Sequence, residues 1–314
     1  MMQSVFLYGL GNIGFRHLQG LVPLRSRVSL IGIDPSPEGR RRAAAEWPGE
    51  GLFLHPSRAP STHAEVVILA TPADTRLDLL RNVVNHHHPG HVILEKVVFQ
   101  SADAFKAAEH LLDDGGVRAW VNCPRRQWPL HMFIRDELKH RGSFKIEFKG
   151  IGWGPACNGI HLIDLLQFYS GESKVNVLSS DVLRVVPSKR AGFSEVEGTF
   201  SFGTRMGMLN FSCVPSDPER PVMSISGNGW QWRIDESAGV VTDELTGDRL
   251  IEAGRAPYQG ELTADAVSPL LDGGGVSPLA SLAVSREAHI PFLAALASAF
   301  EVAGYDLSRG LPIT

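Results

Sequence analysis

The sequence VFLYGLGNIG, residues 5–14, joins a short apolar run to a turn that contains three glycines. The apolar run predicts a buried β-strand. The turn has the pattern Gly9-x-Gly11-x-x-Gly14, which is the spacing of a dinucleotide-binding turn. Gly9 would make the tight turn, Gly11 would let the backbone approach a pyrophosphate, and Gly14 would let the next helix pack closely on the strand. Many unrelated sequences contain such a pattern, so its meaning depends on the rest of the chain.

Length, composition and charge favour a globular protein of two domains. The chain has 314 residues, more than one ordinary hydrophobic core supports. Its net charge of -4 argues against a nucleic-acid-binding protein, which usually presents a basic face. Its longest apolar runs are about five residues, far shorter than a membrane-spanning helix, and we expect no membrane partner. No signal-peptide pattern is present, and 3 cysteines without a CxxC motif favour free thiols in a reducing cytoplasm.

Strands and helices alternate from residue 4 to residue 121, which predicts a doubly wound parallel sheet. The second predicted strand, residues 28–33, ends at Asp34, which lies 20 residues after Gly14 (34 − 14). Dinucleotide folds place an acid there on the adenosine ribose, and a carboxylate repels a 2′-phosphate, so Asp34 favours NAD over NADP. Alternatively, Asp34 only opens a turn before the next helix. The arginines at residues 40–42, expected on a solvated helix face, could still reach a 2′-phosphate, so NADP stays open.

Polar residues also follow the next two predicted strands. Residues 66–70 are apolar throughout, as in a central parallel strand covered on both faces, and residues 92–94 form another such strand. Ligands of open parallel sheets bind beyond the carboxyl ends of the strands, so we expect the residues at these ends to line the cofactor crevice. The alternative for the two charged residues at the end of the second strand, Glu95 and Lys96, is a simple exposed ion pair. The residues concerned are Thr71, Pro72, Glu95 and Lys96.

A group of four histidines, at residues 86–88 and 91, is the one feature that suggests a metal site. It lies beside Pro89-Gly90, and no carboxylate stands at ligand spacing. We therefore predict a solvated turn and no bound metal.

From residue 143 onward apolar and polar residues alternate in short strands that recur to residue 235, separated by glycine turns, and a helix follows near residues 258–267. This pattern predicts a large open sheet, mostly antiparallel, with one solvated face. Such a sheet often pairs with a copy of itself. We therefore expect a homodimer or a dimer-based oligomer.

The chain resembles the Gfo/Idh/MocA family, the glucose–fructose oxidoreductase and inositol dehydrogenase type. The matching residues are 9–14, 70–72, Glu95-Lys96 and His161-Leu162-Ile163-Asp164, in the family's order and spacing. The resemblance implies an N-terminal Rossmann domain, residues 1–121, followed by an α+β domain, residues 122–314, that binds substrate and forms the oligomer. The expected cofactor-binding residues are Gly9, Gly11, Asn12, Ile13, Gly14, Asp34, Thr71, Pro72 and Glu95.

A predicted helix at residues 158–169 carries the block that is most specific to the family. Cys157, His161 and Asp164 share one face of it. The resemblance implies that this face turns toward the nicotinamide, with an acid four residues before His161. Cys157 stands at that place, which puts the family's acid–histidine relay in doubt, and Asp164 does not replace the acid. The alternative for His161 is a hydrogen-bonded histidine in a helix packed on the sheet.

The predicted reaction is hydride transfer between NAD, with NADP not excluded, and a secondary alcohol of a sugar, cyclitol or nucleotide sugar. Lys96 would take or give the hydroxyl proton, because a dry pocket beside the positively charged nicotinamide disfavours the ammonium form. The alternative is a non-catalytic NAD(P)-binding sensor on the same fold. Cys157 favours it, and so does Val97, which stands where the family usually has a proline after the lysine. The expected catalytic residues are Lys96 and His161, and the expected substrate-binding residues are Lys96, Asn122, Arg126, Trp128, Cys157, Asn158 and His161.

Overall fold

The computed structural model describes residues 2–57, 63–273 and 275–314, which form two compact units. Unit 1 comprises residues 1–99, 103–124 and 257–283, and unit 2 comprises residues 100–102, 125–256 and 284–314, apart from the positions outside the described ranges. The chain thus passes from unit 1 to unit 2 near residue 124, close to the predicted boundary. Residues 257–283 return to unit 1, whereas the sequence division placed them in the second domain.

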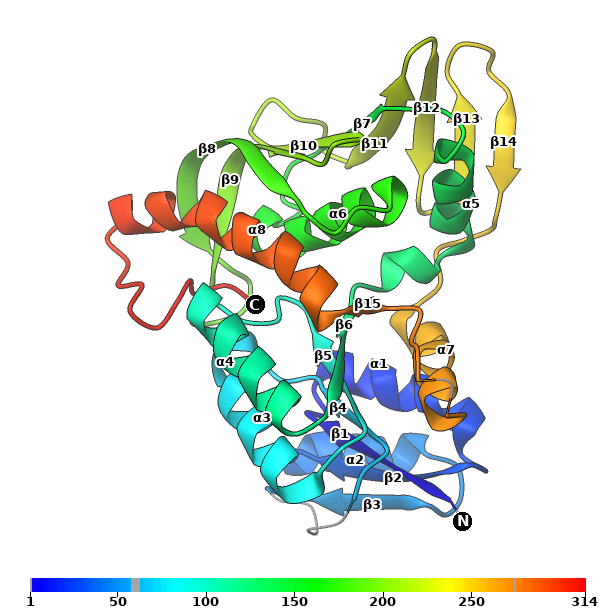
Figure 1. The fold of residues 1–314 in the computed structure, drawn as a ribbon, viewed down its shortest axis with the longest axis vertical. Coiled ribbons are helices and arrows are strands. Elements are labelled where there is room, and N and C mark those ends of the chain that lie inside the picture. The colour runs from blue at the N-terminus through cyan, green and yellow to red at the C-terminus, as the bar shows by residue number, and fades with distance from the viewer. Residues whose placement is uncertain (1, 58–62, 274) are drawn as a thin grey trace. The chain divides into compact units, whose positions relative to one another are not determined.

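Unit 1 is built on a seven-stranded sheet in the order β15-β6-β5-β4-β1-β2-β3 (Figure 1). All neighbours pair in parallel except β15, which is antiparallel to β6. This is the strand order of the dinucleotide-binding doubly wound fold, as predicted. The strands are β1 (Gln3–Tyr8), β2 (Val28–Ile33), β3 (Leu52–His55), β4 (Val66–Leu69), β5 (His91–Glu95), β6 (Arg118–Asn122) and β15 (Ala280–Ser281).

Helices cover both faces of this sheet, which explains why its central strands are apolar throughout. The helices α3 and α4 lie on one face, and α1 and α7 lie on the other (Figure 1). A Cβ at Gly20 of α1 would lie 2.7 Å from the carbonyl oxygen of Gly260, so the missing side chain lets α7 approach closely. The helices are α1 (Asn12–Leu21), η1 (Val22–Leu24), α2 (Pro37–Glu46), α3 (Ala73–His87), α4 (Ala102–Asp114) and α7 (Gln259–Leu271).

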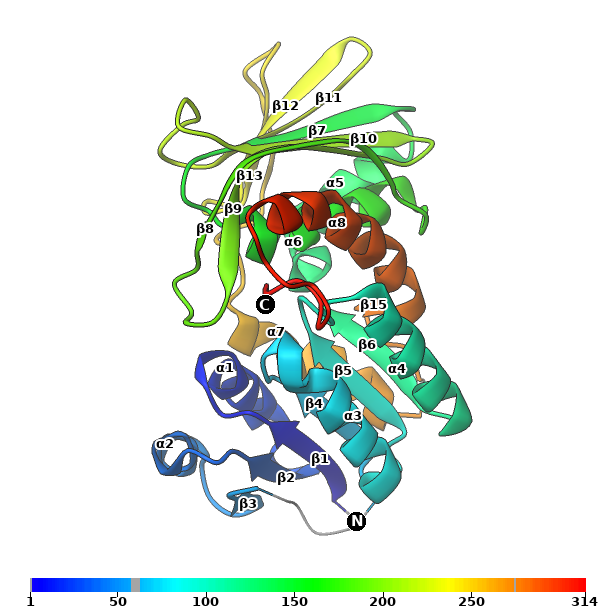
Figure 2. The ribbon, with the colours of Figure 1, turned by 90° about the vertical axis from the view of Figure 1, so that its left-hand side faces the viewer.

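Unit 2 is built on an eight-stranded sheet in the order β14-β13-β12-β11-β7-β10-β9-β8 (Figure 2). Neighbours are antiparallel except β7 and β10, which are parallel, so the predicted mostly antiparallel sheet is confirmed. The strands β13 and β14 extend it beyond residue 235, where none was predicted. Its strands are β7 (Phe144–Lys149), β8 (Asn176–Pro187), β9 (Ser194–Gly203), β10 (Gly207–Cys213), β11 (Val222–Gly227), β12 (Trp230–Asp235), β13 (Val240–Asp243) and β14 (Arg249–Glu252).

The helices α6 and α8 cover one face of the unit 2 sheet (Figure 2). That face is apolar, whereas the other carries charged side chains. Phe211 is buried on the covered face, and a Cβ at Gly159 of α6 would lie 3.1 Å from its ring. On the opposite face Lys145 pairs with Glu147 at 2.8 Å. The helices of this unit are η2 (Pro124–Gln127), α5 (Pro129–Leu138), α6 (Pro155–Ser170) and α8 (Leu282–Val302), of which η2 and α8 begin in unit 1.

Candidate active site

The glycine turn after β1 has the geometry that a dinucleotide needs. Gly9 has φ +89°, and a Cβ at Gly14 would lie 1.8 Å from the carbonyl oxygen of Gly9, so both positions require glycine. A Cβ at Gly11 would meet nothing within 4 Å, which leaves open space beside the backbone there. Gly11 is also the N-cap of α1 and brings no side-chain hydrogen bond to it. The N–H groups of the first turn, from Asn12 and Ile13 onward, therefore suit a pyrophosphate, and the turn fits NAD.

Asp34 connects the end of β2 to this turn. Its carboxylate accepts hydrogen bonds from the N–H groups of Leu10, at 2.5 Å, and Ser36, at 2.7 Å. Both bonds leave lone pairs that ribose hydroxyls can reach. Arg40 donates to the Asp34 carbonyl oxygen and Arg42 to that of Leu10, so these two arginines contact the turn, contrary to the expectation of a merely solvated face.

The ends of β4 and β5 are held together by a buried arginine that the sequence analysis missed. Arg76 of α3 is 1% exposed and donates hydrogen bonds to the carbonyl oxygens of Thr71, Val97 and Val98. A Cβ at Gly9 would lie 3.4 Å from Cγ2 of Thr71, so the threonine lies beside the glycine turn. Pro72 is the N-cap of α3. Arginine is rarely fully buried unless it is paired. The sequence shows that Arg76 lies five residues after Thr71, but it does not show that this side chain is buried.

Glu95 lies inside unit 1, which contradicts the alternative of an exposed ion pair at this strand end. Its carboxylate is 8% exposed and accepts hydrogen bonds from Nε2 of His17, at 2.8 Å, and from the side-chain amide of Asn122. Burial alone would raise the pKa of Glu95, but the hydrogen bonds from His17 and Asn122 and the charges of His17 and Lys96 outweigh it and lower that pKa. Lys96 is partly exposed, and its peptide bond to Val97 is cis.

This arrangement changes the expected roles of two residues. Asn122, expected to face the substrate, is 3% exposed, and its amide is committed to Glu95. One carboxylate oxygen of Glu95, Oε1, accepts both hydrogen bonds, from His17 and from Asn122. His17, which the sequence analysis did not single out, lies three residues after Gly14 on the face of α1 that packs inward.

In unit 2 a narrow stripe along the helix α6 is partly exposed, and it carries several residues of the predicted site. Eleven of its residues are buried, and its partly exposed residues include Cys157, Asn158 and His161, which lie in its N-terminal half. The Cys157 thiol donates to the carbonyl oxygen of Thr314 at 2.7 Å. At the start of the helix the N–H of Ala156 donates to the carboxylate of Glu195, from β9, at 2.9 Å. An acid therefore lies at this turn of the helix although residue 157 is a cysteine.

Asp164 is buried, and Arg126 binds it with two hydrogen bonds. Nε and Nη2 of Arg126 donate to the two carboxylate oxygens at 3.0 and 2.6 Å. Burial raises the pKa of Asp164 above its ordinary value, although the charge and hydrogen bonds of Arg126 act in the opposite direction. Arg126 also lies over the Phe168 ring, 5.2 Å from its centroid. Its guanidinium, expected to bind substrate, is thus engaged within the unit.

Arg125 belongs to a second buried network. It pairs with Glu236 at 3.3 Å, and His131 joins Glu236, at 2.9 Å, to the Tyr169 hydroxyl, at 2.6 Å. Burial is the main cause that lowers the pKa of His131 and raises that of Tyr169. Trp128 stacks on the His131 ring at 5.2 Å. Arg125 and Arg126 therefore both pair with carboxylates of unit 2.

Of the four histidines at the end of α3 and the start of β5, two are buried, which differs from the predicted solvated turn. His87 is buried and bonds to the Tyr8 hydroxyl at 2.7 Å, and His91 is buried beside Arg118 and Trp120. In residues 2–57, 63–273 and 275–314 no group of three or more His, Cys, Asp or Glu side chains could hold a metal ion. No helix in the same ranges is long and apolar enough to cross a membrane.

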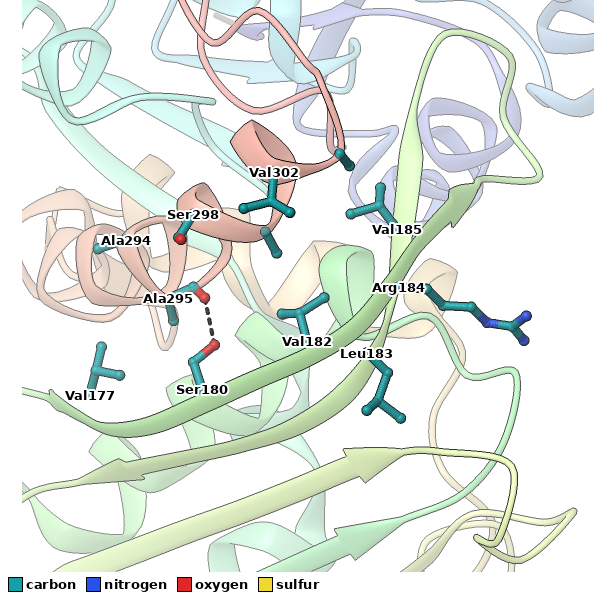
Figure 3. A pocket seen from close by; sticks show the side chains of 12 residues that line it. Val177, Ser180, Val182, Leu183, Arg184, Val185, Ala294, Ala295, Ser298 and Val302 are labelled. Carbon is teal, nitrogen blue, oxygen red and sulfur yellow. Dashed lines mark hydrogen bonds between the residues drawn. The ribbon is translucent and has the colours of Figure 1, made fainter.

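A groove of about 750 Å³ lies in unit 2 between β8 and α8 (Figure 3). Its lining is mostly small and apolar, with Ser180 donating to the carbonyl oxygen of Ala295 at 2.6 Å. None of the predicted site residues lines it, so the groove is separate from the stripe on α6.

Comparison with known proteins agrees with the resemblance seen in the sequence. Residues 4–123 match the model of an oxidoreductase family with an NAD-binding Rossmann fold, GFO_IDH_MocA. No curated protein sequence gave a significant match.

Solved structures share the fold along nearly the whole chain. An oxidoreductase from Agrobacterium radiobacter, in complex with NAD+, L-tartaric acid and magnesium, is 16% identical with a TM-score of 0.72, covering 95% of this chain and 96% of that chain. The WlbA dehydrogenase from Bordetella pertussis, in complex with NADH and UDP-GlcNAcA, is 18% identical with a TM-score of 0.68, covering 96% and 98%. A putative myo-inositol dehydrogenase from Sinorhizobium meliloti 1021 is 16% identical with a TM-score of 0.68, covering 96% and 98%. Residues 4–123 therefore resemble the NAD-binding Rossmann domain of this oxidoreductase family, and the likeness of the whole chain to the solved structures is one of fold.

Proposed function

We propose that the chain is an NAD-dependent dehydrogenase that oxidises a secondary alcohol of a sugar, cyclitol or nucleotide sugar, or catalyses the reverse reduction. The observation that carries the proposal is the position of Lys96. It is the partly exposed residue directly after the buried, hydrogen-bonded Glu95 at the carboxyl end of β5, in the unit that also holds the glycine turn. A ligand of this sheet type binds at that edge.

The residues that would hold NAD are those of the glycine turn and Asp34. The N–H groups at the start of α1 would bind the pyrophosphate, and Asp34 would accept hydrogen bonds from the adenosine ribose. When bound, NAD supplies the hydride acceptor or donor. A preference for NAD over NADP is part of the proposal and rests on Asp34, although Arg40 and Arg42 lie at the same turn.

Lys96 would take the proton of the substrate hydroxyl during oxidation and return it during reduction. His161, on the partly exposed stripe of α6 that also carries Cys157 and Asn158, is the second residue that we assign to the reaction. Trp128, which stacks on a buried histidine, would pack against the sugar ring, as aromatic faces do.

Three features support the proposed substrate class, cellular location and oligomeric state. The structural neighbours include proteins crystallised with UDP-GlcNAcA or described as a putative myo-inositol dehydrogenase, which supports a polyhydroxylated substrate. The three cysteines, all described, form no disulfide, which supports a cytoplasmic protein. The eight-stranded sheet of unit 2, which α6 and α8 cover on one face, supports a homodimer formed through its other face.

A screen of sugars, polyols and nucleotide sugars with NAD, followed by NADH absorbance, tests the proposal. With the substrate so found, Lys96→Ala should lower kcat by about 100-fold or more, as loss of a general acid–base group does. Lys139→Ala is the matched control, because that lysine is exposed and pairs only with Asp136 on the surface of α5. Unchanged turnover in Lys96→Ala would refute the assigned role.

A non-catalytic NAD sensor is the second candidate. The observation that favours it is the state of α6, where residue 157 is a cysteine whose thiol is directed to a backbone carbonyl and Asp164 is committed to Arg126. Tight NAD binding with no turnover on any compound of the screen would support the sensor instead.

A further inference from the structure

The buried histidine of α1 connects three parts of unit 1 at the edge where Lys96 lies. Nε2 of His17 binds Glu95, at the end of β5, and Nδ1 binds the Thr263 hydroxyl, on α7, at 3.0 Å. Both distances are those of hydrogen bonds, and His17 and Thr263 are 1% and 2% exposed. Because an ionised carboxylate can only accept, the hydrogen of the first bond is on Nε2 of His17.

Glu95 is in turn fastened to β6. Its backbone pairs with Asn122 in the sheet, and the Asn122 side chain donates to the same carboxylate oxygen as His17. The groups around this carboxylate are therefore His17 from α1, Asn122 from β6, and the charge of the adjacent Lys96. A buried carboxylate would be costly without such donors, so these partners keep it ionised.

The ionised Glu95 has a direct consequence for its neighbour. When Lys96 accepts the proton of a substrate hydroxyl, an ammonium forms next to a negative charge that is already in place. A fixed charge of this kind stabilises the charge that develops during the reaction without any reorganisation. The loss of a donor to Glu95 would remove this effect without removing Lys96.

We propose that His17 is a positioning residue of the reaction, which holds the Glu95 carboxylate as an anion beside Lys96 and couples it to α7 through Thr263. The proposal rests on the proposed dehydrogenase function. His17 touches neither substrate nor hydride in this account, and it acts only through Glu95 and Lys96.

The test compares His17→Phe, which has no donor, with His17→Gln, whose amide nitrogen can take the place of Nε2. In His17→Phe we expect kcat to fall about tenfold or more, while KM and the Kd for NAD stay within about twofold. The acid limb of the pH profile of kcat should shift from its wild-type position, because the buried Glu95 then protonates more readily and the negative charge next to Lys96 is lost. His17→Gln should restore most of kcat and the original acid limb.

His87→Phe is the control for loss of a buried histidine in the same unit, since it removes a hydrogen bond to Tyr8 away from Glu95. It should lower stability without moving the acid limb. Equal effects of His17→Phe and His87→Phe on kcat, with unchanged pH profiles, would overturn the proposal. If His17→Phe does not fold, Thr263→Val, which removes only the hydroxyl bound to Nδ1, should give a smaller shift of the acid limb in the same direction, and no shift would overturn it.

The two proposals fail in different ways. If the wild-type protein turns over no substrate, the dehydrogenase function fails, and His17 is then tested by the titration of the Glu95 carboxyl. That titration is followed by NMR with carboxyl-labelled glutamate and assigned with Glu95→Gln. A titration midpoint that is the same in wild type, His17→Phe and Thr263→Val would show that His17 does not hold the Glu95 anion.

Discussion

In unit 1 the residues of the predicted site come from the ends of neighbouring strands, whereas in unit 2 the stripe on α6 is held by residues from far along the chain. The glycine turn, Asp34 and Thr71 follow β1, β2 and β4 in order, and each position is visible in a short stretch of sequence. On α6 the partners are Arg126, Glu195 and Thr314. Local sequence therefore determines the cofactor side, whereas long-range packing determines the side that carries His161.

Removing Arg126 should have the largest effect on stability, and it tests how far α6 depends on distant partners. Arg126→Leu would leave the Asp164 carboxyl buried without its partner, which should cost about 3–5 kcal/mol of unfolding free energy. Urea unfolding measures this. The double variant Arg126→Leu/Asp164→Leu should recover much of the loss, because no buried charge remains. If the double variant is as unstable as the single one, the loss of unfolding free energy does not come from the unpaired Asp164 carboxyl.

A substitution in the glycine turn probes the local side of the comparison. In Gly14→Ala the new Cβ would meet the Gly9 carbonyl oxygen, so we expect a loss of about 1–3 kcal/mol and a severe loss of NAD affinity. Gly11→Ala is the matched variant, because its Cβ meets nothing. It should change stability by about 0.5 kcal/mol or less and still weaken NAD binding about tenfold or more. Unfolding curves and NAD titration give both quantities, and equal stability losses would refute the distinction.

Replacing Glu195 should have a smaller effect. Glu195→Gln keeps an acceptor for the Ala156 N–H but removes the negative charge at the N-terminus of α6. The expected loss is about 0.3–1 kcal/mol, the usual value for such a charge, and it should shrink at high salt. A loss that does not depend on salt would mean that packing, not charge, is responsible.

The two buried carboxyls should give opposite slopes of stability against pH. The pKa of Glu95 is lowered, so the unfolded chain holds a proton that the folded protein has released, and stability falls as pH decreases below about 4.3 toward the folded pKa. The pKa of Asp164 is raised, so stability instead falls as pH increases from about 3.9 toward the folded pKa. Unfolding between about pH 3 and 6 should show that Glu95→Gln removes the first slope and Asp164→Asn the second. Parallel changes in both variants would contradict these directions.

The sequence predicted the fold wherever the signal is local and periodic. The alternating strands and helices of unit 1 and the alternating pattern from residue 143 both gave the observed sheets. The sequence did not predict β13 and β14, because four-residue strands such as Val240–Asp243 are too short for a clear alternation. It also predicted a helix near residues 258–267 without showing that α7 packs on α1, since an apolar helix face does not specify its partner.

The site was predictable to the same extent. The glycine spacing and Asp34 follow from the requirements of a ribose and a pyrophosphate, so sequence distance alone identifies them. His17 and Asn122 bind Glu95 across 78 and 27 residues, and only strand order brings them together. For the same reason the partners of Arg125 and Arg126 were not predictable, because the carboxylates lie on distant elements.

The discontinuity of unit 1 has a consequence for how the protein is made. Ala266, Val267, Leu270 and Leu279, all from residues 257–283, belong to the same hydrophobic core as Leu18 of α1. When only residues 1–124 have been synthesised, the hydrophobic core of unit 1 therefore still lacks the residues that form one wall of it. All of residues 125–256 must be synthesised before that wall is available, so unit 1 cannot complete its core directly after its first 124 residues are made.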